Sequence, residues 1–149
     1  MKITENIDKD LLSSMKNHDK LGEKVYKAIK AKIMEFKTAK NAKPFDEQAE
    51  ISLLRKMIKE RQESANIYFE NKRDDLGNEE KSEAEFIEKL IDKSGIKSFS
   101  DEEISDNIKK EYPDGIEKKM MGSVIKEYKE KYFGIDGKEL SDIVRKFII

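Results

Sequence analysis

The side chains that most often carry out catalysis are scarce in this sequence. His18 is its one histidine, cysteine is absent, and neither a glycine-rich phosphate loop nor a calcium-loop spacing occurs. One histidine cannot assemble a histidine-based zinc site, and a chain without cysteine has no thiolate ligand or nucleophile. Ser13 and Lys16 match the letters S-x-x-K, but they fall at the end of a short amphipathic helix where no oxyanion donors are expected. We therefore expect no catalytic residue, no metal site and no cofactor.

Charged side chains are abundant, but they cancel over the whole chain. Lys, Arg, Asp and Glu make up 42% of the 149 residues, and the formal net charge is −1. Such a chain does not attract polyanions as a whole, so a nucleic-acid contact needs a local basic patch. Residues 20–43 hold eight Lys against two Glu. These lysines fit a phosphate-binding stripe, but they also fit the solvated face of an amphipathic helix, which we favour.

The spacing of apolar residues predicts an all-α fold with two subdomains. Apolar residues recur at helical intervals, and no alternating run of strand length is present. Ser94-Gly95 interrupts this pattern within the predicted boundary, 93–98. The predicted domains are an N-terminal helical subdomain, residues 1–93, and a C-terminal three-helix bundle, residues 94–149.

In the N-terminal subdomain we expect four helices, over about 3–16, 20–40, 46–72 and from Asn78 onward. Asp46 is the predicted cap of the long third helix. Leu76-Gly77-Asn78 is the predicted break after it, because glycine often follows the last turn of a helix. The inward-facing residues are expected to include Val25, Ile29, Ile51, Leu54, Ile58, Ala65, Phe69, Ala84, Ile87 and Ile91.

The C-terminal subdomain shows three apolar stripes, which predict a small bundle. Start signals precede them: Ser100 with Glu103, then Asp114 with Glu117, then Asp136 with Glu139. Gly122 would weaken a helix interior, so it indicates either a helix terminus or, as we favour, a site of close helix packing. The stripes comprise Ile104, Ile108 and Tyr112; Ile116, Met120, Val124 and Tyr128; and Leu140, Val144 and Phe147.

Two segments resemble the hallmarks of a known family. Residues 53–90 read LLRKMIKERQESANIYFENKRDDLGNEEKSEAEFIEKL, with R-Q, a serine, an aromatic pair, R-D-D-L and then E-K-S-E. Residues 120–144 read MMGSVIKEYKEKYFGIDGKELSDIV, with Met-Gly at a helix start and D-G-K before the last helix. On both hallmarks, in the same order, the chain resembles the YqeY family (also written GatB/YqeY) over nearly its whole length. It departs from the family at Leu90-Ile91, where members commonly have Leu-Pro, and at Gly134-Ile135, where they have Gly-Arg.

The resemblance implies a link to tRNA. The family is similar in fold to the tail domain of the B subunit of the glutamine-dependent tRNA amidotransferase, a tail implicated in holding tRNA while other domains carry out the chemistry. By this analogy, the expected RNA-binding residues are basic side chains of the C-terminal bundle: Lys118, Lys119, Lys126, Lys129, Lys138, Arg145 and Lys146. The polar hallmark residues are Arg61, Arg73, Asp74 and Glu83, which form either a fixed network at a helix junction or, as we favour, caps and surface pairs.

Three functions remain open from the sequence. The first is a non-catalytic helical module that binds tRNA or associates with an amidotransferase-type complex. The second is a protein-interaction scaffold without RNA contact, and the third is an accessory subunit of a glutamine-dependent carbon–nitrogen ligase. The first residues, MKITENIDKDLL, lack an apolar leader core, and no apolar run approaches the roughly 20 residues of a membrane span. We expect a cytoplasmic protein without a membrane partner.

Overall fold

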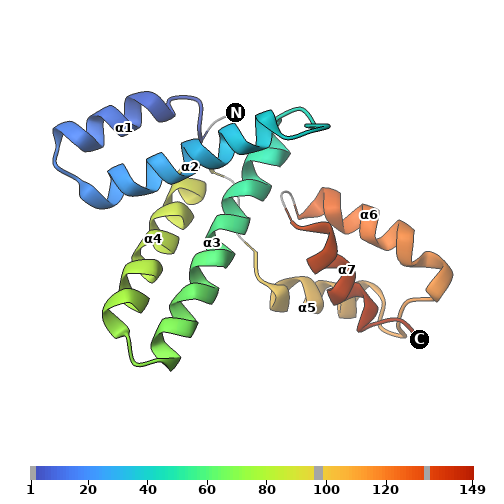
Figure 1. The fold of residues 1–149 in the computed structure, drawn as a ribbon. Coiled ribbons are helices and arrows are strands. Elements are labelled where there is room, and N and C mark those ends of the chain that lie inside the picture. Colours follow the sequence, from blue (N-terminus) through green and yellow to red (C-terminus); the bar gives the residue numbers. More distant parts are fainter. Residues whose placement is uncertain (1–2, 96–98, 133–134) are drawn as a thin grey trace. The chain divides into compact units, whose positions relative to one another are not determined.

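A computed structural model describes residues 3–95, 99–132 and 135–149 (Figure 1). These residues form seven α-helices and one short 3₁₀ helix without a named strand, so the all-α prediction is confirmed. The chain divides into two compact units, residues 1–96 and 97–149. The predicted boundary, 93–98, lies partly outside the described residues.

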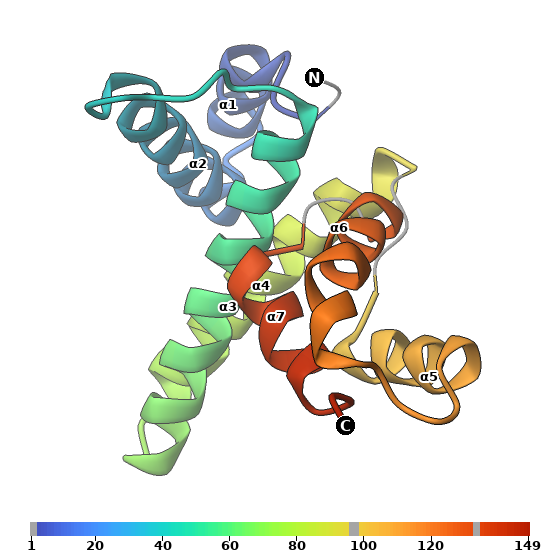
Figure 2. The ribbon, with the colours of Figure 1, turned by 90° about the vertical axis from the view of Figure 1, so that its right-hand side faces the viewer.

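The first unit contains four helices: α1 (Ile7–Lys16), α2 (Lys20–Thr38), α3 (Glu47–Glu70) and α4 (Asp74–Lys93). Carboxylates fix two of the helix starts, because Asp19 accepts a hydrogen bond from the Gly22 amide at 3.0 Å and Asp46 accepts one from the Ala49 amide at 2.8 Å. The cap predicted at Asp46 is therefore confirmed. α3 and α4 run antiparallel, side by side, as a long hairpin (Figure 2).

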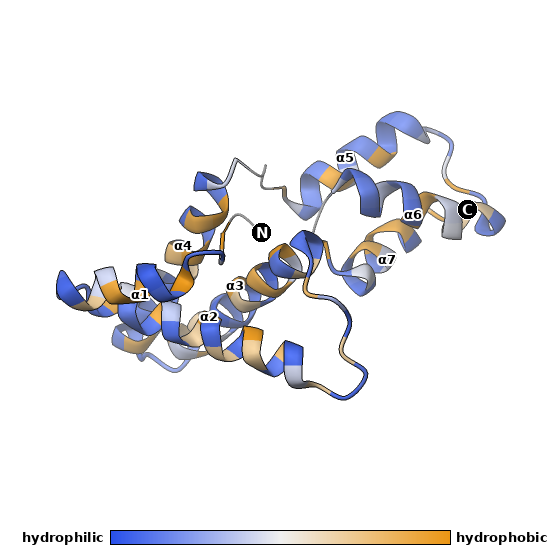
Figure 3. Cartoon of the chain, turned by 90° about the horizontal axis from the view of Figure 1, so that it is seen from above, coloured by the Kyte–Doolittle hydropathy of each residue, from blue (hydrophilic) through white to orange (hydrophobic). Residues whose placement is uncertain are grey.

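Apolar faces of α2, α3 and α4 form the core of this unit. Outward faces of the same helices are hydrophilic (Figure 3). Most of the predicted inward residues are buried, but Phe69 is 37% exposed and Met57, which the sequence did not single out, is buried. The core cluster comprises Val25, Ile29, Leu54, Met57, Ile58, Ala84, Ile87 and Ile91.

The predicted break at Leu76-Gly77-Asn78 is wrong, because all of these residues lie inside α4. α3 ends at Glu70, within two residues of the predicted end at about 72, and Lys72 adopts a left-handed backbone conformation with φ of 60°. The amide of Arg73 then donates to the Tyr68 carbonyl at 2.8 Å, and that of Lys72 donates to the Phe69 carbonyl at 3.1 Å. These two bonds form a Schellman motif built on a lysine where glycine is usual.

Gly77 serves packing instead of a helix end. A Cβ atom built on Gly77 would lie 2.6 Å from Cε1 of Phe69. The Phe69 ring on α3 thus packs directly on the backbone of α4 at Gly77, at a separation that leaves no room for a Cβ atom.

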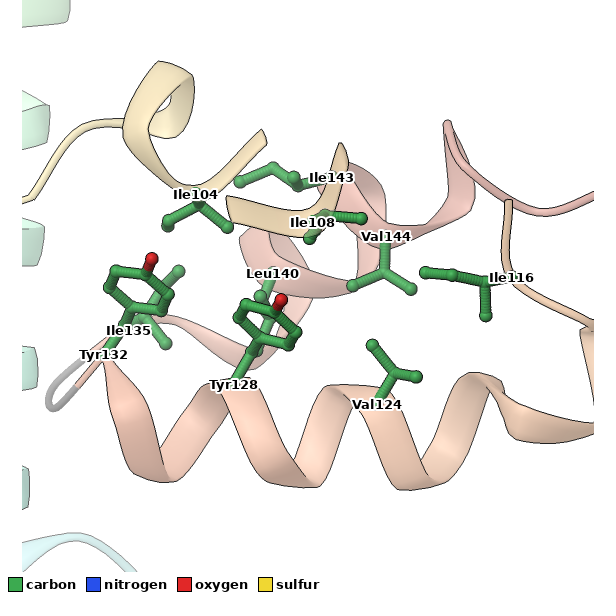
Figure 4. Packing of buried hydrophobic residues seen from close by; sticks show 10 residues of the cluster. All are labelled: Ile104, Ile108, Ile116, Val124, Tyr128, Tyr132, Ile135, Leu140, Ile143 and Val144. Carbon is green, nitrogen blue, oxygen red and sulfur yellow. The ribbon is translucent and has the colours of Figure 1, made fainter. Parts of the chain in front are cut away.

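The second unit contains α5 (Asp101–Glu111), the 3₁₀ helix η1 (Lys118–Met120), α6 (Met121–Lys131) and α7 (Gly137–Arg145). Ser100 accepts a hydrogen bond from the Glu103 amide at 3.2 Å, and Asp136 accepts one from the Lys138 amide at 3.4 Å, as predicted for these two starts. The interior is lined by all three α-helices (Figure 4): Ile104, Ile108, Ile116, Val124, Tyr128, Tyr132, Ile135, Leu140, Ile143 and Val144.

Three expectations for α6 are wrong. The helix does not begin at the Asp114–Glu117 pair, because Ile116 is extended and pairs with the end of the chain. The Ile116 amide donates to the Phe147 carbonyl at 2.8 Å, and the Ile149 amide donates to the Ile116 carbonyl at 3.0 Å. Met120 is 41% exposed, and Gly122 has no atom within 4 Å of a built Cβ, so Gly122 is no packing site. Phe147 lies beyond α7, although it packs against the core.

Candidate functional site

A buried carboxylate lies where α2, α3 and α4 meet. The Glu83 side chain on α4 is 4% exposed, and the Arg61 side chain on α3 is 15% exposed. Oε1 of Glu83 lies 3.9 Å from Nε of Arg61 and 3.7 Å from Nζ of Lys24 on α2. The structure thus brings together two of the four hallmark residues and adds Lys24, which the sequence placed only in a general basic stripe.

Neighbouring groups set the electrostatics of this junction. Lys24 Nζ donates to Glu79 at 3.0 Å, and this bond raises the pKa of Lys24. Burial, followed by the nearby charge of Glu83, raises the pKa of the Glu80 carboxyl. Arg61 Nη1 donates to the Met57 carbonyl at 3.4 Å on its own helix. These contacts link the side chains of α2, α3 and α4. The junction offers no nucleophile with an adjacent base.

The other two hallmark residues lie elsewhere, at the turn that joins α3 to α4. Arg73 donates from Nε and Nη2 to the two carboxylate oxygens of Asp75, each at 3.3 Å. This pairing raises the pKa of Arg73 and lowers that of Asp75. Asp74 is exposed in the first turn of α4, about 14 Å along the helix from Glu83 at 1.5 Å per residue. The four residues therefore do not form one site.

The predicted RNA-binding residues are all exposed on the second unit. Lys118 and Lys119 lie on η1, Lys126 and Lys129 on α6, and Lys138, Arg145 and Lys146 on or directly after α7. Lys119 pairs with Glu117 at 3.3 Å, and Arg145 pairs with Asp142 at 3.7 Å. In the described part of the chain the other members form no ion pair: Lys118, Lys126, Lys129, Lys138 and Lys146.

The start of α7 lies close to the second half of α6. Nζ of Lys129 is 3.8 Å from a Cβ built on Gly137, the first residue of α7. The ammonium of Lys129 and the backbone amides that begin α7 are thus neighbours, and both favour negative charge. Gly134, which departs from the family pattern together with Ile135 just before this start, lies outside the described residues.

Two stacked tyrosines, Tyr128 on α6 and Tyr132 directly after it, lie beside α5, and Tyr132 was not among the predicted residues. The rings of Tyr128 and Tyr132 lie parallel, with centroids 5.9 Å apart. The side-chain amide of Asn107 donates a hydrogen bond to the Tyr132 hydroxyl, and Lys131 pairs with Glu111 at 3.0 Å. Burial raises the pKa of Tyr128, with the nearby Glu111 adding to the effect. The i, i+4 spacing of the two tyrosines is the signal that could have indicated this stacked pair.

Within the ranges that the structure describes, no group of three His, Cys, Asp or Glu residues could hold a metal ion. In the same ranges, no helix has the length and apolar composition needed to cross a membrane.

Two comparisons relate this chain to known proteins. The sequence profile of the family described as "Yqey-like protein" matches residues 4–148. The chain is also 31% identical over 101 residues to "Altered inheritance of mitochondria protein 41, mitochondrial" from Saccharomyces cerevisiae strains YJM789 and Lalvin EC1118 / Prise de mousse. That alignment covers 68% of this chain and 54% of the yeast protein, so the chain spans about half the length of these curated relatives. On the profile match over residues 4–148, the chain belongs to the YqeY family.

Proposed function

We propose that this protein is a non-catalytic helical module that binds tRNA, alone or as part of an amidotransferase-type complex. The observation that carries the proposal is the set of five exposed lysines without an ion pair in the described part of the second unit: Lys118, Lys126, Lys129, Lys138 and Lys146. Unpaired lysines can neutralise phosphates without first breaking internal pairs.

The placement of these lysines supports the proposal further. Lys126 and Lys129 lie on α6, whose Tyr128 is buried in the core, and Lys129 adjoins the positive end of α7. Residues 115–149 hold eight basic against six acidic side chains, so the local charge is positive although the chain is nearly neutral. The chain belongs to the YqeY family, and the resemblance of that family to a tRNA-holding tail supports tRNA as the partner.

The test is a mobility-shift titration of bulk tRNA at several salt concentrations. Replacing Lys126, Lys129, Lys138 and Arg145 by Ala should weaken binding, and the log–log salt slope should fall by about 1 for each phosphate that is no longer neutralised. The matched control changes Lys9, Lys16, Lys89 and Lys93 of the first unit to Ala, which removes the same charge. Equal affinity for wild type and the C-terminal variant would refute these C-terminal residues as the tRNA site, and the absence of any tRNA shift would refute the proposal.

A protein-interaction scaffold is the second candidate. Leu12 and Met15 lie three residues apart on α1 and are 59% and 45% exposed. Exposed apolar side chains on one helix face suit a protein partner. This function would give binding that is insensitive to salt between about 50 and 200 mM, with no tRNA shift.

The third candidate is an accessory role in glutamine-dependent carbon–nitrogen ligation. The junction around Glu83 offers no nucleophile with an adjacent base, so such a role would require other subunits. Glutaminase or transamidation activity from the purified chain alone would contradict the non-catalytic proposal.

We further propose that the protein acts in the cytoplasm, and its cysteine-free composition fits a reducing compartment of this kind. Microscopy of a fluorescent fusion of the complete protein tests the compartment. The yeast relatives carry the word mitochondrial in their own names, and an organellar signal would contradict the cytoplasmic proposal.

A further inference from the structure

The loop between α2 and α3 concentrates positive charge that the rest of α2 does not have. Over residues 24–34, helix lysines are neutralised by acids: Lys27 pairs with Glu23 at 2.8 Å, and Lys30 pairs with Asp8 at 2.6 Å. Lys24 and Lys32 likewise have acidic partners. The basic stripe suggested by the sequence is therefore largely cancelled along the helix.

At the end of α2 the pattern changes. Residues 36–45, FKTAKNAKPF, contain three lysines and no acid. Lys37, Lys40 and Lys43 are exposed, and none forms an ion pair within the described part of the chain. Asp46 follows, but its carboxylate caps α3 through the Ala49 amide at 2.8 Å. Within the described part of the chain, these three ammonium groups thus have no ion-pair partner, although Glu35 and Asp46 flank the segment. The loop is defined here as residues 36–45, which comprise the last three residues of α2 and most of the connection to α3.

Residues 39–46, which connect α2 to α3, extend beyond the ends of both helices (Figures 1 and 3). Phe45 packs edge-on against Phe36 of α2, with centroids 5.4 Å apart. Lys37 Nζ lies 5.5 Å from the centroid of the Phe45 ring. The Ala42 amide donates to the Ala39 carbonyl at 3.1 Å and closes a turn. The three ammonium groups are therefore carried on an anchored loop.

We infer that the loop 36–45 is a second RNA contact, which binds the sugar–phosphate backbone through Lys37, Lys40 and Lys43. The choice of RNA rests on the proposed function, and the physical basis is charge complementarity to phosphate. An anionic membrane fits less well, because the side chains between the lysines are small or polar and both rings are half-buried against each other. The loop lacks an exposed large apolar residue to insert between lipid headgroups.

The test compares three variants of the full chain by fluorescence anisotropy with labelled bulk tRNA. The loop variant, K37A/K40A/K43A, should lose about tenfold in affinity, and its salt slope should fall by about 2–3. The matched control, K27A/K30A/K32A, removes the same charge from α2 and should change affinity less than about twofold, because these lysines are already paired with acids. Circular dichroism melting confirms that each variant folds.

The outcomes separate this inference from the proposed function. A lower tRNA affinity in the loop variant but not in the C-terminal variant K126A/K129A/K138A/R145A would support the loop as an RNA contact and refute the proposed C-terminal site. A lower affinity in the C-terminal variant alone would refute the loop as an RNA contact. Equal losses of tRNA affinity in the loop and control variants would show a general effect of net charge, and would also refute the loop as an RNA contact. Sedimentation with phosphatidylserine vesicles is the remaining arm: lysine-dependent vesicle binding without tRNA binding would identify the loop as a membrane contact instead.

Discussion

The Glu83 carboxylate lies 3.9 Å from Nε of Arg61, and both side chains are largely withdrawn from water. The two residues come from facing helices of the α3–α4 hairpin, and Lys24 of α2 completes the group at 3.7 Å. A buried charge is costly unless it is compensated, so the pair matters most when one partner is removed.

We predict that Glu83→Gln lowers the free energy of unfolding by about 2–4 kcal/mol, because the Arg61 guanidinium loses its compensating charge. Urea denaturation followed by circular dichroism measures the change. The exposed neighbour Glu79 provides the control, since Glu79→Gln should cost less than about 1 kcal/mol. The double variant Arg61→Met with Glu83→Leu should regain most of the free energy of unfolding. If the double variant is no more stable than Glu83→Gln, the loss in Glu83→Gln does not come from the unpaired Arg61 charge.

Gly77 and Gly122 should respond oppositely to alanine. Gly77→Ala places a Cβ 2.6 Å from the Phe69 ring, which should outweigh the helix preference for Ala and destabilise by about 1–2 kcal/mol. Gly122→Ala meets open space and should stabilise by up to about 1 kcal/mol. Thermal melts of both variants decide the matter, and in a Phe69→Ala background the penalty at Gly77 should disappear.

Two helix ends carry a non-glycine residue in the left-handed region. His18 has φ of 56° after α1, and Lys72 has φ of 60° after α3. Replacing either residue by Gly should stabilise the fold by about 0.5–1 kcal/mol, because an L side chain strains this conformation. Chemical denaturation of Lys72→Gly tests the expectation, with Lys59→Gly in the interior of α3 as a control that should lose about 1 kcal/mol.

Glu80 gives a prediction about pH. Its pKa is raised, mainly by burial and then by the charge of Glu83, so the folded state favours the protonated carboxyl. The stability that protonation contributes is present below the unfolded pKa and is lost as pH rises through the folded pKa. Glu80→Gln should therefore stabilise the protein at about pH 7, by less than about 1 kcal/mol, and confer no advantage near about pH 3. Urea denaturation of both proteins at the two pH values measures the difference, and a benefit that grows toward acid would contradict this assignment.

Local signals in the sequence were enough to predict the all-α fold class and the first residues of several helices. Asp46, Ser100 and Asp136 cap their helices because an N-cap depends on residues within one turn. The end of α3 was predicted to within two residues, but the start of α4 was not, because Gly77 was interpreted as a helix end and lies inside α4.

Long-range contacts account for what the sequence did not reveal. Ile116 has a helical spacing to Val124, but pairing with residues 147–149 holds it extended. Glu83 and Arg61 could be named from their motif, whereas Lys24 joins them only because α2 packs on α4 across more than fifty residues of chain.

The bridge between Ile116 and Ile148 also constrains how this unit is made during translation. Its two partners are separated by the whole of η1, α6 and α7, so the contact has a high sequence separation and is costly to form early. Ile116 can form this pairing only after residues 147–149 have emerged from the ribosome. A nascent chain stalled before that point would hold this segment without its native partner, and pulse proteolysis of ribosome-bound intermediates would detect the delay.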